Sequence, residues 1–242
     1  MIAGRDARQI QIQVERAWTG VRAAVAQMYS TTEIRPDDAT IVFRPEPSST
    51  GEPQVSAGPV VFRVPERASK RDANLYIVVK GWISFAPILE PPSLTTQRFG
   101  TNVGYFRAKP DRLDHVYGVH YDMEEEQPCH PVFHAQISSQ ASLASVVREN
   151  FTVPSDECDI AAGLLKNVRT PTAQMDVFSL ITQIGADHLV YEGSSAEVRD
   201  AFIRLRTACD FFVGAAGRLV YLHEDSAAHC YRSTHWYDRQ GA

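Results

Sequence analysis

The sequence predicts an α+β fold with an N-terminal helix, an antiparallel sheet of five or six strands, and C-terminal helices packed on the sheet. Apolar residues recur at helical spacing over residues 5–29. Residues 39–138 then hold six short runs rich in β-branched and aromatic residues, and helical spacing returns from residue 139. Because no helix-length segment separates the six runs, we expect an antiparallel sheet rather than parallel β-α-β units.

The N-terminal helix is predicted over residues 5–29 from an apolar seam with steps of three and four. The seam is close to a heptad repeat, so two interpretations stay open: packing on the protein's own sheet, or docking on a partner or a second copy. It consists of Ile10, Val14, Ala17, Val21, Ala24 and Met28.

The six strand-like runs are bounded by proline, glycine and charged residues, which interrupt sheets. Two proline-rich connections, residues 44–59 and 88–100, are predicted to be loops. The runs themselves cover residues 40–43, 60–64, 74–85, 102–108, 113–123 and 130–138.

The C-terminal part is predicted to be helical over residues 139–213, followed by a tail over residues 214–242 with one strand at 218–223. A short helix is expected within residues 139–151, and a longer one from Pro171, because proline suits a first helical turn. A third helix is expected after an N-cap at Ser194 or Ser195. We interpret residues 1–242 as a single domain.

Composition sets limits on function and location. The net charge of −5 provides no global basic field for nucleic acid. The charged N-terminus lacks the apolar stretch of a signal peptide, no apolar run reaches the length of a membrane span, and the four cysteines are widely spaced. We therefore expect a cytoplasmic protein without a disulfide framework and without membrane contact.

A candidate site lies in residues 116–138, where His120 and Asp122 precede His130 and His134. Side chains two residues apart share one face of a strand, so an antiparallel hairpin with an even register sum puts all four on one side. The intervening glutamates, residues 124–126, would then lie beside them.

Three interpretations of these residues stay open. The cluster could be structural, as polar faces of hairpins often are. His120, Asp122 and His134 could bind a divalent metal such as Zn²⁺. Alternatively, His120, His130 and His134 could act as general acid and base, because histidine titrates near neutral pH.

Two basic elements extend the list of candidates. Arg169, just before the predicted helix start at Pro171, could bind an anion there or form a salt bridge with Asp122. A basic run could bind nucleic acid if strands gather it into a patch. That run consists of Arg63, Arg67, Lys70 and Arg71.

These motifs resemble an uncharacterised bacterial domain-of-unknown-function family with the pattern H/R-x-D, H-P-x-x-H and R-x-P, found near defence genes and mobile elements. The resemblance covers residues 113–190. It implies a bacterial source and that these residues form one unit. The family often has arginine at the position of His120, and its spacing to R-x-P is shorter. The matching residues are His120, Asp122, His130, Pro131, His134, Arg169 and Pro171.

Two functional hypotheses follow. The first is a hydrolase, of nuclease or toxin-like effector type, that uses His120, Asp122, His130, His134 and Arg169. The second is a non-catalytic subunit of a bacterial defence or toxin–antitoxin complex, with a protein partner or a second copy of itself.

Overall fold

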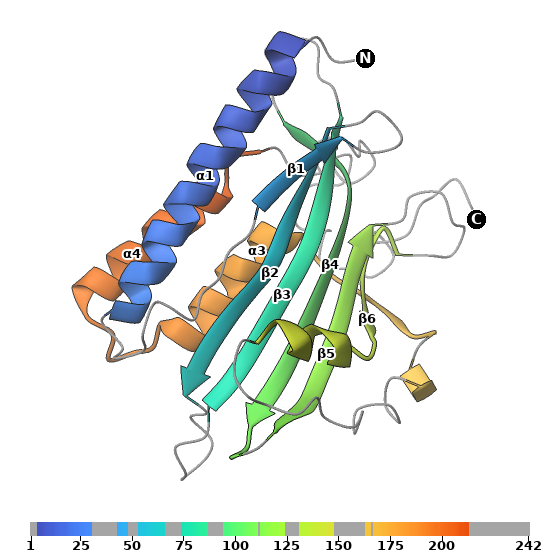
Figure 1. Cartoon of the computed structure of the whole chain (residues 1–242), viewed down its shortest axis with the longest axis vertical. Helices are drawn as coiled ribbons and strands as arrows, with labels where there is room; N and C mark the ends of the chain where they lie inside the picture. The colour runs from blue at the N-terminus through green and yellow to red at the C-terminus, as the bar shows by residue number, and fades with distance from the viewer. Residues whose placement is uncertain are drawn as a thin grey trace, which may run out of the picture.

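The computed structural model describes residues 4–30, 43–47, 53–65, 74–86, 94–110, 112–123, 131–147, 163–165 and 167–212. The predicted α+β fold is confirmed, with an N-terminal helix, an antiparallel sheet and C-terminal helices (Figure 1). Its main elements are α1 (Gly4–Ser30), β1 (Phe43–Pro47), β2 (Pro53–Pro65), β3 (Asn74–Ala86), β4 (Thr95–Ala108), β5 (Leu113–Met123), β6 (Phe133–Ile137), the 3-10 helix η2 (Ala141–Val146), β7 (Arg169–Pro171), α3 (Val177–Ile184), the π-helix η3 (Gly185–Leu189) and α4 (Ala196–Cys209).

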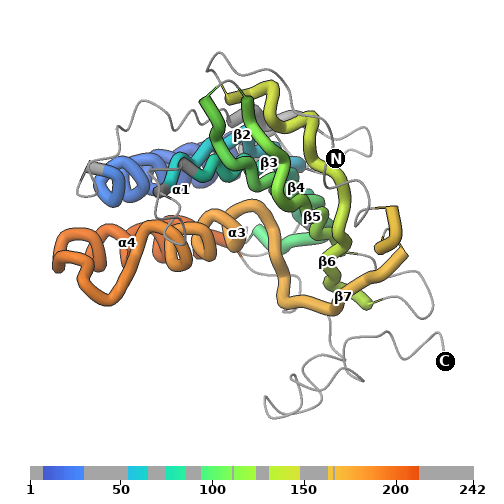
Figure 2. Tube along the Cα trace, turned by 90° about the horizontal axis from the view of Figure 1, so that it is seen from below, coloured from blue at the N-terminus to red at the C-terminus, as the bar shows by residue number. Residues whose placement is uncertain are grey.

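The strands follow one another across the sheet in chain order from β1 to β7. Figure 2 shows this order for β2 to β7. Each neighbouring pair is antiparallel. The predicted pairing of residues 113–123 with residues 130–138 is confirmed, because β5 pairs with β6. Five or six strands were predicted, and the sheet has seven in the described part of the chain. The additional strand is the short edge strand β7.

Three helices cover one face of the sheet. Helix α1 buries Val14, Val21 and Met28 completely, in the same core as sheet residues such as Phe62. Trp18 of α1 meets Phe178 of α3 edge to face at 5.9 Å between ring centroids. The interpretation of α1 as a helix packed within its own chain is therefore confirmed.

The other face carries the short helix η2 at one end of the strands. A second apolar cluster beneath it joins Leu143 to Val78, Phe106 and Leu113. Figure 1 shows η2 and α3 on opposite sides of the sheet. His120 and Asp122 lie further along β5 on the η2 face.

The predicted proline-rich loops are partly wrong, because strands extend into both of them. Strand β2 begins at Pro53 and continues through Gly58 and Pro59 with a register shift between Ala57 and Val60. A bulge accommodates proline because the missing N–H falls outside the ladder of hydrogen bonds. Strand β4 likewise begins at Thr95, within the second predicted loop.

The predicted helix start at Pro171 is also wrong. Pro171 ends β7, and α3 begins only at Val177 after an N-cap at Asp176. The predicted helix at residues 139–151 is a 3-10 turn over Ala141–Val146 rather than an α-helix, as far as these residues are described. The N-cap at Ser195 is confirmed, because its side chain accepts a hydrogen bond from Val198 N.

Several sequence predictions fall outside the described residues, namely the strand start at 40–42 and everything from residue 213 onward. No helix in the described part of the chain combines the length and hydropathy needed to span a membrane.

Candidate functional site

The register between β5 and β6 brings the polar residues of the two strands together. Asp122 pairs with His134, and His120 pairs with Gln136, so the register sum is even as the shared-face argument required. Tyr121, next to them on β5, faces the helices and packs against the main core. The predicted convergence of His120, Asp122 and His134 on one side of the sheet is confirmed.

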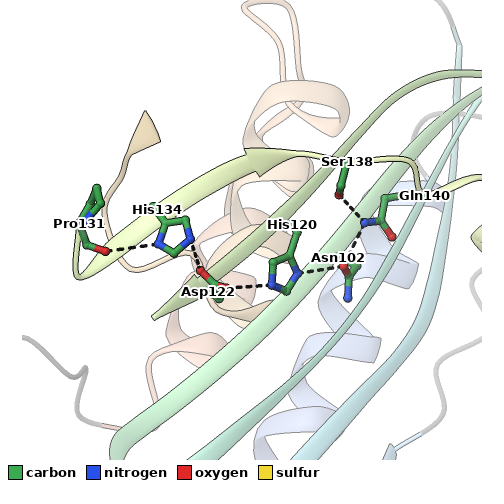
Figure 3. Close-up of polar contacts among 7 residues, drawn as sticks. All are labelled: Asn102, His120, Asp122, Pro131, His134, Ser138 and Gln140. Atoms are coloured by element: carbon green, nitrogen blue, oxygen red, sulfur yellow. Dashed lines mark hydrogen bonds and ion pairs between the residues drawn. The ribbon is translucent and has the colours of Figure 1, made fainter. Parts of the chain in front are cut away.

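Asp122 lies between the two histidine rings (Figure 3). Its Oδ2 lies 3.1 Å from His120 Nε2, and its Oδ1 lies 2.5 Å from His134 Nε2 in an ion pair. The Asp122 carboxylate therefore contacts His120 on its own strand, β5, through one oxygen and His134 on β6 through the other. We name this arrangement of His120, Asp122 and His134 the His–Asp–His row.

Each outer ring nitrogen of the row has an oxygen partner. His120 Nδ1 lies 3.0 Å from Asn102 Oδ1 on β4, and His134 Nδ1 lies 3.3 Å from the carbonyl oxygen of Pro131. Gln140, just before η2, donates to the same Asn102 oxygen at 3.0 Å. The row, which spans β5 and β6, is thus linked to β4 through Asn102, and Gln140 holds Asn102 in place.

Each ring nitrogen of the two histidines lies near an oxygen atom. Three of these contacts are hydrogen bonds, namely those of both His120 nitrogens and that of His134 Nδ1. The fourth contact, between His134 Nε2 and Asp122 Oδ1, is an ion pair without hydrogen-bond geometry. An ionised carboxylate only accepts hydrogen bonds, so the His120 nitrogen that faces Asp122 is the donor of their hydrogen bond.

The titration of Asp122 follows from the same contacts. Burial alone would raise the pKa of its carboxyl, but the hydrogen bonds and charges of His120 and His134 outweigh burial and hold the pKa well below its usual range. Asp122 therefore stays ionised throughout the physiological range of pH.

Exposure separates the roles of the two histidines. The side chain of His134 is 2% exposed, whereas those of His120 and Asp122 are 31% and 32% exposed. His120 and Asp122 are therefore partly open to solvent on this face of the sheet, whereas His134, on the neighbouring strand, is covered.

A metal ion requires donor atoms that converge on one point. In the row, the donor atoms point at each other, and no group of three or more His, Cys, Asp or Glu residues in the described ranges is arranged to hold a metal ion. The metal hypothesis for His120, Asp122 and His134 stays a prediction that would require the rings to turn.

Arg169 lies on the same face as the row but not in contact with Asp122. It is exposed and pairs with Gln136 across β6 and β7. The predicted salt bridge between Arg169 and Asp122 is wrong for the arrangement described, because Asp122 is occupied by the two histidines. The reason is that β7 adds a strand where a helix start was expected.

The cross-strand register reveals neighbours that the sequence interpretation missed. Lys80 on β3 pairs with Asn102, which pairs with His120. Trp82 pairs with Gly100, which pairs with Asp122. Alternation on β4 would have placed Asn102 on the right face, but only the pairing shows which residue of β5 it meets.

The remaining candidates are only partly described. Arg63 lies on β2 with its guanidinium 5.8 Å from the ring centroid of Tyr76. The other members of the predicted site and basic run, His130, Arg67, Lys70 and Arg71, lie outside the described residues, as do the glutamates at 124–126.

No protein-family model, curated protein or solved structure matches the chain significantly. The resemblance of residues 113–190 to a bacterial family therefore stays a prediction.

Proposed function

We propose that the protein is a metal-independent phosphodiester hydrolase in which the imidazolium of His120 acts as general acid. The observation that supports this most is the pairing of a partly exposed histidine with a carboxylate whose pKa is held low, because such a carboxylate keeps the imidazolium charged.

In the proposed reaction a water oxygen forms a bond to phosphorus as the bond from phosphorus to the leaving oxygen breaks. His120 gives its Nδ1 proton to the leaving oxygen. For this step the leaving oxygen takes the place of Asn102 Oδ1 as the hydrogen-bond acceptor of His120 Nδ1. The attacking water releases one proton to solvent, and His120 takes up a proton from solvent. Asp122 stabilises the imidazolium, and Lys80 and Arg169 attract the phosphate charge.

The setting we propose is a bacterial defence or toxin-like effector acting inside the cell. The resemblance of residues 113–190 suggests that setting, and hydrolysis of a nucleic acid phosphodiester is a reaction by which such an effector would act.

A second candidate function is a non-catalytic subunit of the same kind of system. One observation favours it: every ring nitrogen of His120 and His134 already has a partner within the chain. In this proposal the row serves only to fasten β4, β5 and β6 together.

Cleavage assays separate the two candidates. We expect the purified chain to cleave labelled single-stranded RNA or DNA, or an activated aryl phosphodiester, in the presence of a chelator. His120→Ala and His120→Gln should each reduce the rate at least about 100-fold, the scale of a general acid's contribution.

His188→Ala is the matched control. His188 belongs to η3, and its ring packs beside Tyr105 of β4 on the face of the sheet that the helices cover. It should cleave at the parental rate. A parent chain that cleaves none of these substrates would reject the hydrolase and leave the non-catalytic subunit. Cleavage that appears only when a divalent metal is added would reject the metal-independent step.

A further inference from the structure

Trp82 lies beside the His–Asp–His row because of a glycine. A Cβ atom on residue 100 would lie only 2.7 Å from Trp82 Nε1 and 3.1 Å from Cε2. The indole therefore lies across Gly100, in space that any other residue on β4 would fill. Since Gly100 pairs with Trp82 on one side and with Asp122 on the other, the indole lies against the strand that separates it from Asp122.

The indole is accessible from this face. Trp82 is only partly buried, unlike Tyr76 and Val78, which precede it on the same face of β3 and are covered by η2. An indole that extends over a glycine of the neighbouring strand gives a planar apolar surface beside a charged row. Such a surface accepts the π-face of a planar ligand.

Cationic residues surround this aromatic surface. One cross-strand line runs from Lys80 through Asn102, His120 and Gln136 to Arg169, and both of its end residues are exposed. Arg98, two residues before Gly100 on β4, is exposed on the same face. Among the described residues of β3 to β7 on this face, Asp122 is the one carboxylate, and it lies between two histidines.

The dimensions favour a polymer over a small anion. Four strand spacings separate Lys80 from Arg169, which corresponds to about 19 Å at the usual distance between strands. Stacking surfaces beside a track of positive charge are the common means of binding single-stranded nucleic acid without sequence preference.

We propose that this face binds single-stranded nucleic acid, with one base stacked on Trp82 and the backbone crossing the strands from Lys80 toward Arg169. This arrangement places a phosphodiester near His120. The inference specifies the substrate of the proposed function, and for cleavage it rests on that function, whereas binding is tested separately.

Binding is measured by fluorescence anisotropy with a labelled 12-nucleotide single strand and full-length His120→Gln protein, so that cleavage does not interfere. Trp82→Ala in this background should weaken binding roughly 5- to 150-fold, the effect of losing one stacked base. Trp82→Phe should recover most of that loss. Tyr191→Ala, which removes an exposed aromatic ring in the turn before α4, should leave affinity unchanged.

Lys80→Ala tests the backbone track. It should weaken binding and reduce the slope of log affinity against log salt by about 0.7, the value expected for one phosphate contact with a single strand. A Trp82→Ala variant that binds as tightly as its parent would overturn the inference. Equal affinity for a duplex or for heparin would overturn it too, in favour of a general polyanion surface.

The two proposals fail separately. Binding that depends on Trp82, without any cleavage by the parent chain, rejects the hydrolase and supports the single-strand surface. Cleavage that depends on His120, with a KM unaffected by Trp82→Ala, supports the hydrolase and rejects the surface.

Discussion

Asp122 determines the electrostatics of the His–Asp–His row, because both histidines direct a ring nitrogen at its two oxygens. This carboxylate lies between two histidine rings on a face that also carries Lys80 and Arg169. Removing the carboxylate would take away the partner of one ring nitrogen on each of two neighbouring strands. The row is therefore sensitive to changes at this residue in both binding and stability.

Acid titration should reveal this dependence. Because the folded pKa of Asp122 is depressed, its contribution to stability is complete above the unfolded value of about 3.9 and is lost as pH falls through the folded pKa. We expect the difference in unfolding free energy between the parent and Asp122→Asn to be constant down to about pH 4 and to shrink at lower pH. Urea denaturation from pH 7 to pH 2 measures it, and a difference that grows in acid would contradict the assignment.

His134 should behave as a supporting residue. Its ring is 2% exposed and bonded to both Pro131 and Asp122, so truncation removes a buried partner of a charge. We expect His134→Ala to lower the unfolding free energy by roughly 2–4 kcal/mol, at the lower end of the range for breaking a buried pair because Asp122 is partly exposed.

Chemical denaturation measures this loss. His120→Ala is the comparison, with a smaller loss of stability but a larger loss of any cleavage activity. A His134→Ala protein with parental stability and no activity would instead make His134 the catalytic group.

At the scale of elements, the start of α3 depends on a buried carboxylate. Asp176 accepts hydrogen bonds from Phe178 N and Ser179 N, from Ser179 Oγ and from Gln174 Nε2. Burial raises the pKa of its carboxyl more than these hydrogen bonds lower it. The side chain of Asp176 therefore has a full set of hydrogen-bond donors, but burial disfavours the ionised form of its carboxyl group.

Two substitutions separate bonding from charge. Asp176→Ala removes every acceptor and should destabilise the protein by roughly 1–2 kcal/mol, the scale of a lost N-cap. Asp176→Asn keeps one acceptor oxygen and removes the charge, so its loss should be clearly smaller. Thermal or urea unfolding of both variants tests this, and equal losses would show that the charge, not the bonding, stabilises α3.

The sequence predicted elements whose signals are local. Strand β5 and the N-cap at Ser195 were found because alternation and capping act over a few neighbouring residues. Strand β7 was missed because three residues, R-T-P, form a strand only when β6 offers its edge. Pro171 then resembled a helix start.

The site was predicted on the same terms. The convergence of His120, Asp122 and His134 was predictable because it depends only on how two adjacent strands of one hairpin pair, with paired residue numbers that add to an even sum. Asn102 was not predicted, because its pairing depends on an extra residue on β5, Val116, between the pairs Tyr105–Tyr117 and Phe106–His115. One such shift changes which face every later side chain occupies.

At the scale of the whole molecule, α1 is part of the main core. Val21 is fully buried, whereas its neighbour Arg22 is exposed. We expect deletion of residues 1–30 to give insoluble or unfolded protein, because the deletion bares the apolar core that α1 covers. Solubility and circular dichroism measure the outcome.

A matched pair of substitutions refines this test. Val21→Asp should reproduce the failure of the deletion, because it buries a charge without a partner. Arg22→Asp should stay soluble, with stability close to that of the parent. A truncated chain that folds but no longer associates with a partner would show that α1 is a docking helix.

The contact between α1 and α4 joins the first and the last helix of the described residues. Gly20 of α1 faces Ala208 of α4 so closely that a Cβ atom on residue 20 would lie only 3.0 Å from the Ala208 Cβ, and Arg204 donates to Gln27 at 2.6 Å. During translation, α1 leaves the ribosome before the sheet, and the strands can then pair one after another in chain order. The flank that α4 covers stays bare until almost all of the described fold has been synthesised. A messenger RNA truncated before the codon for residue 196 would therefore yield a chain that has its sheet but lacks α4, the helix that packs against α1.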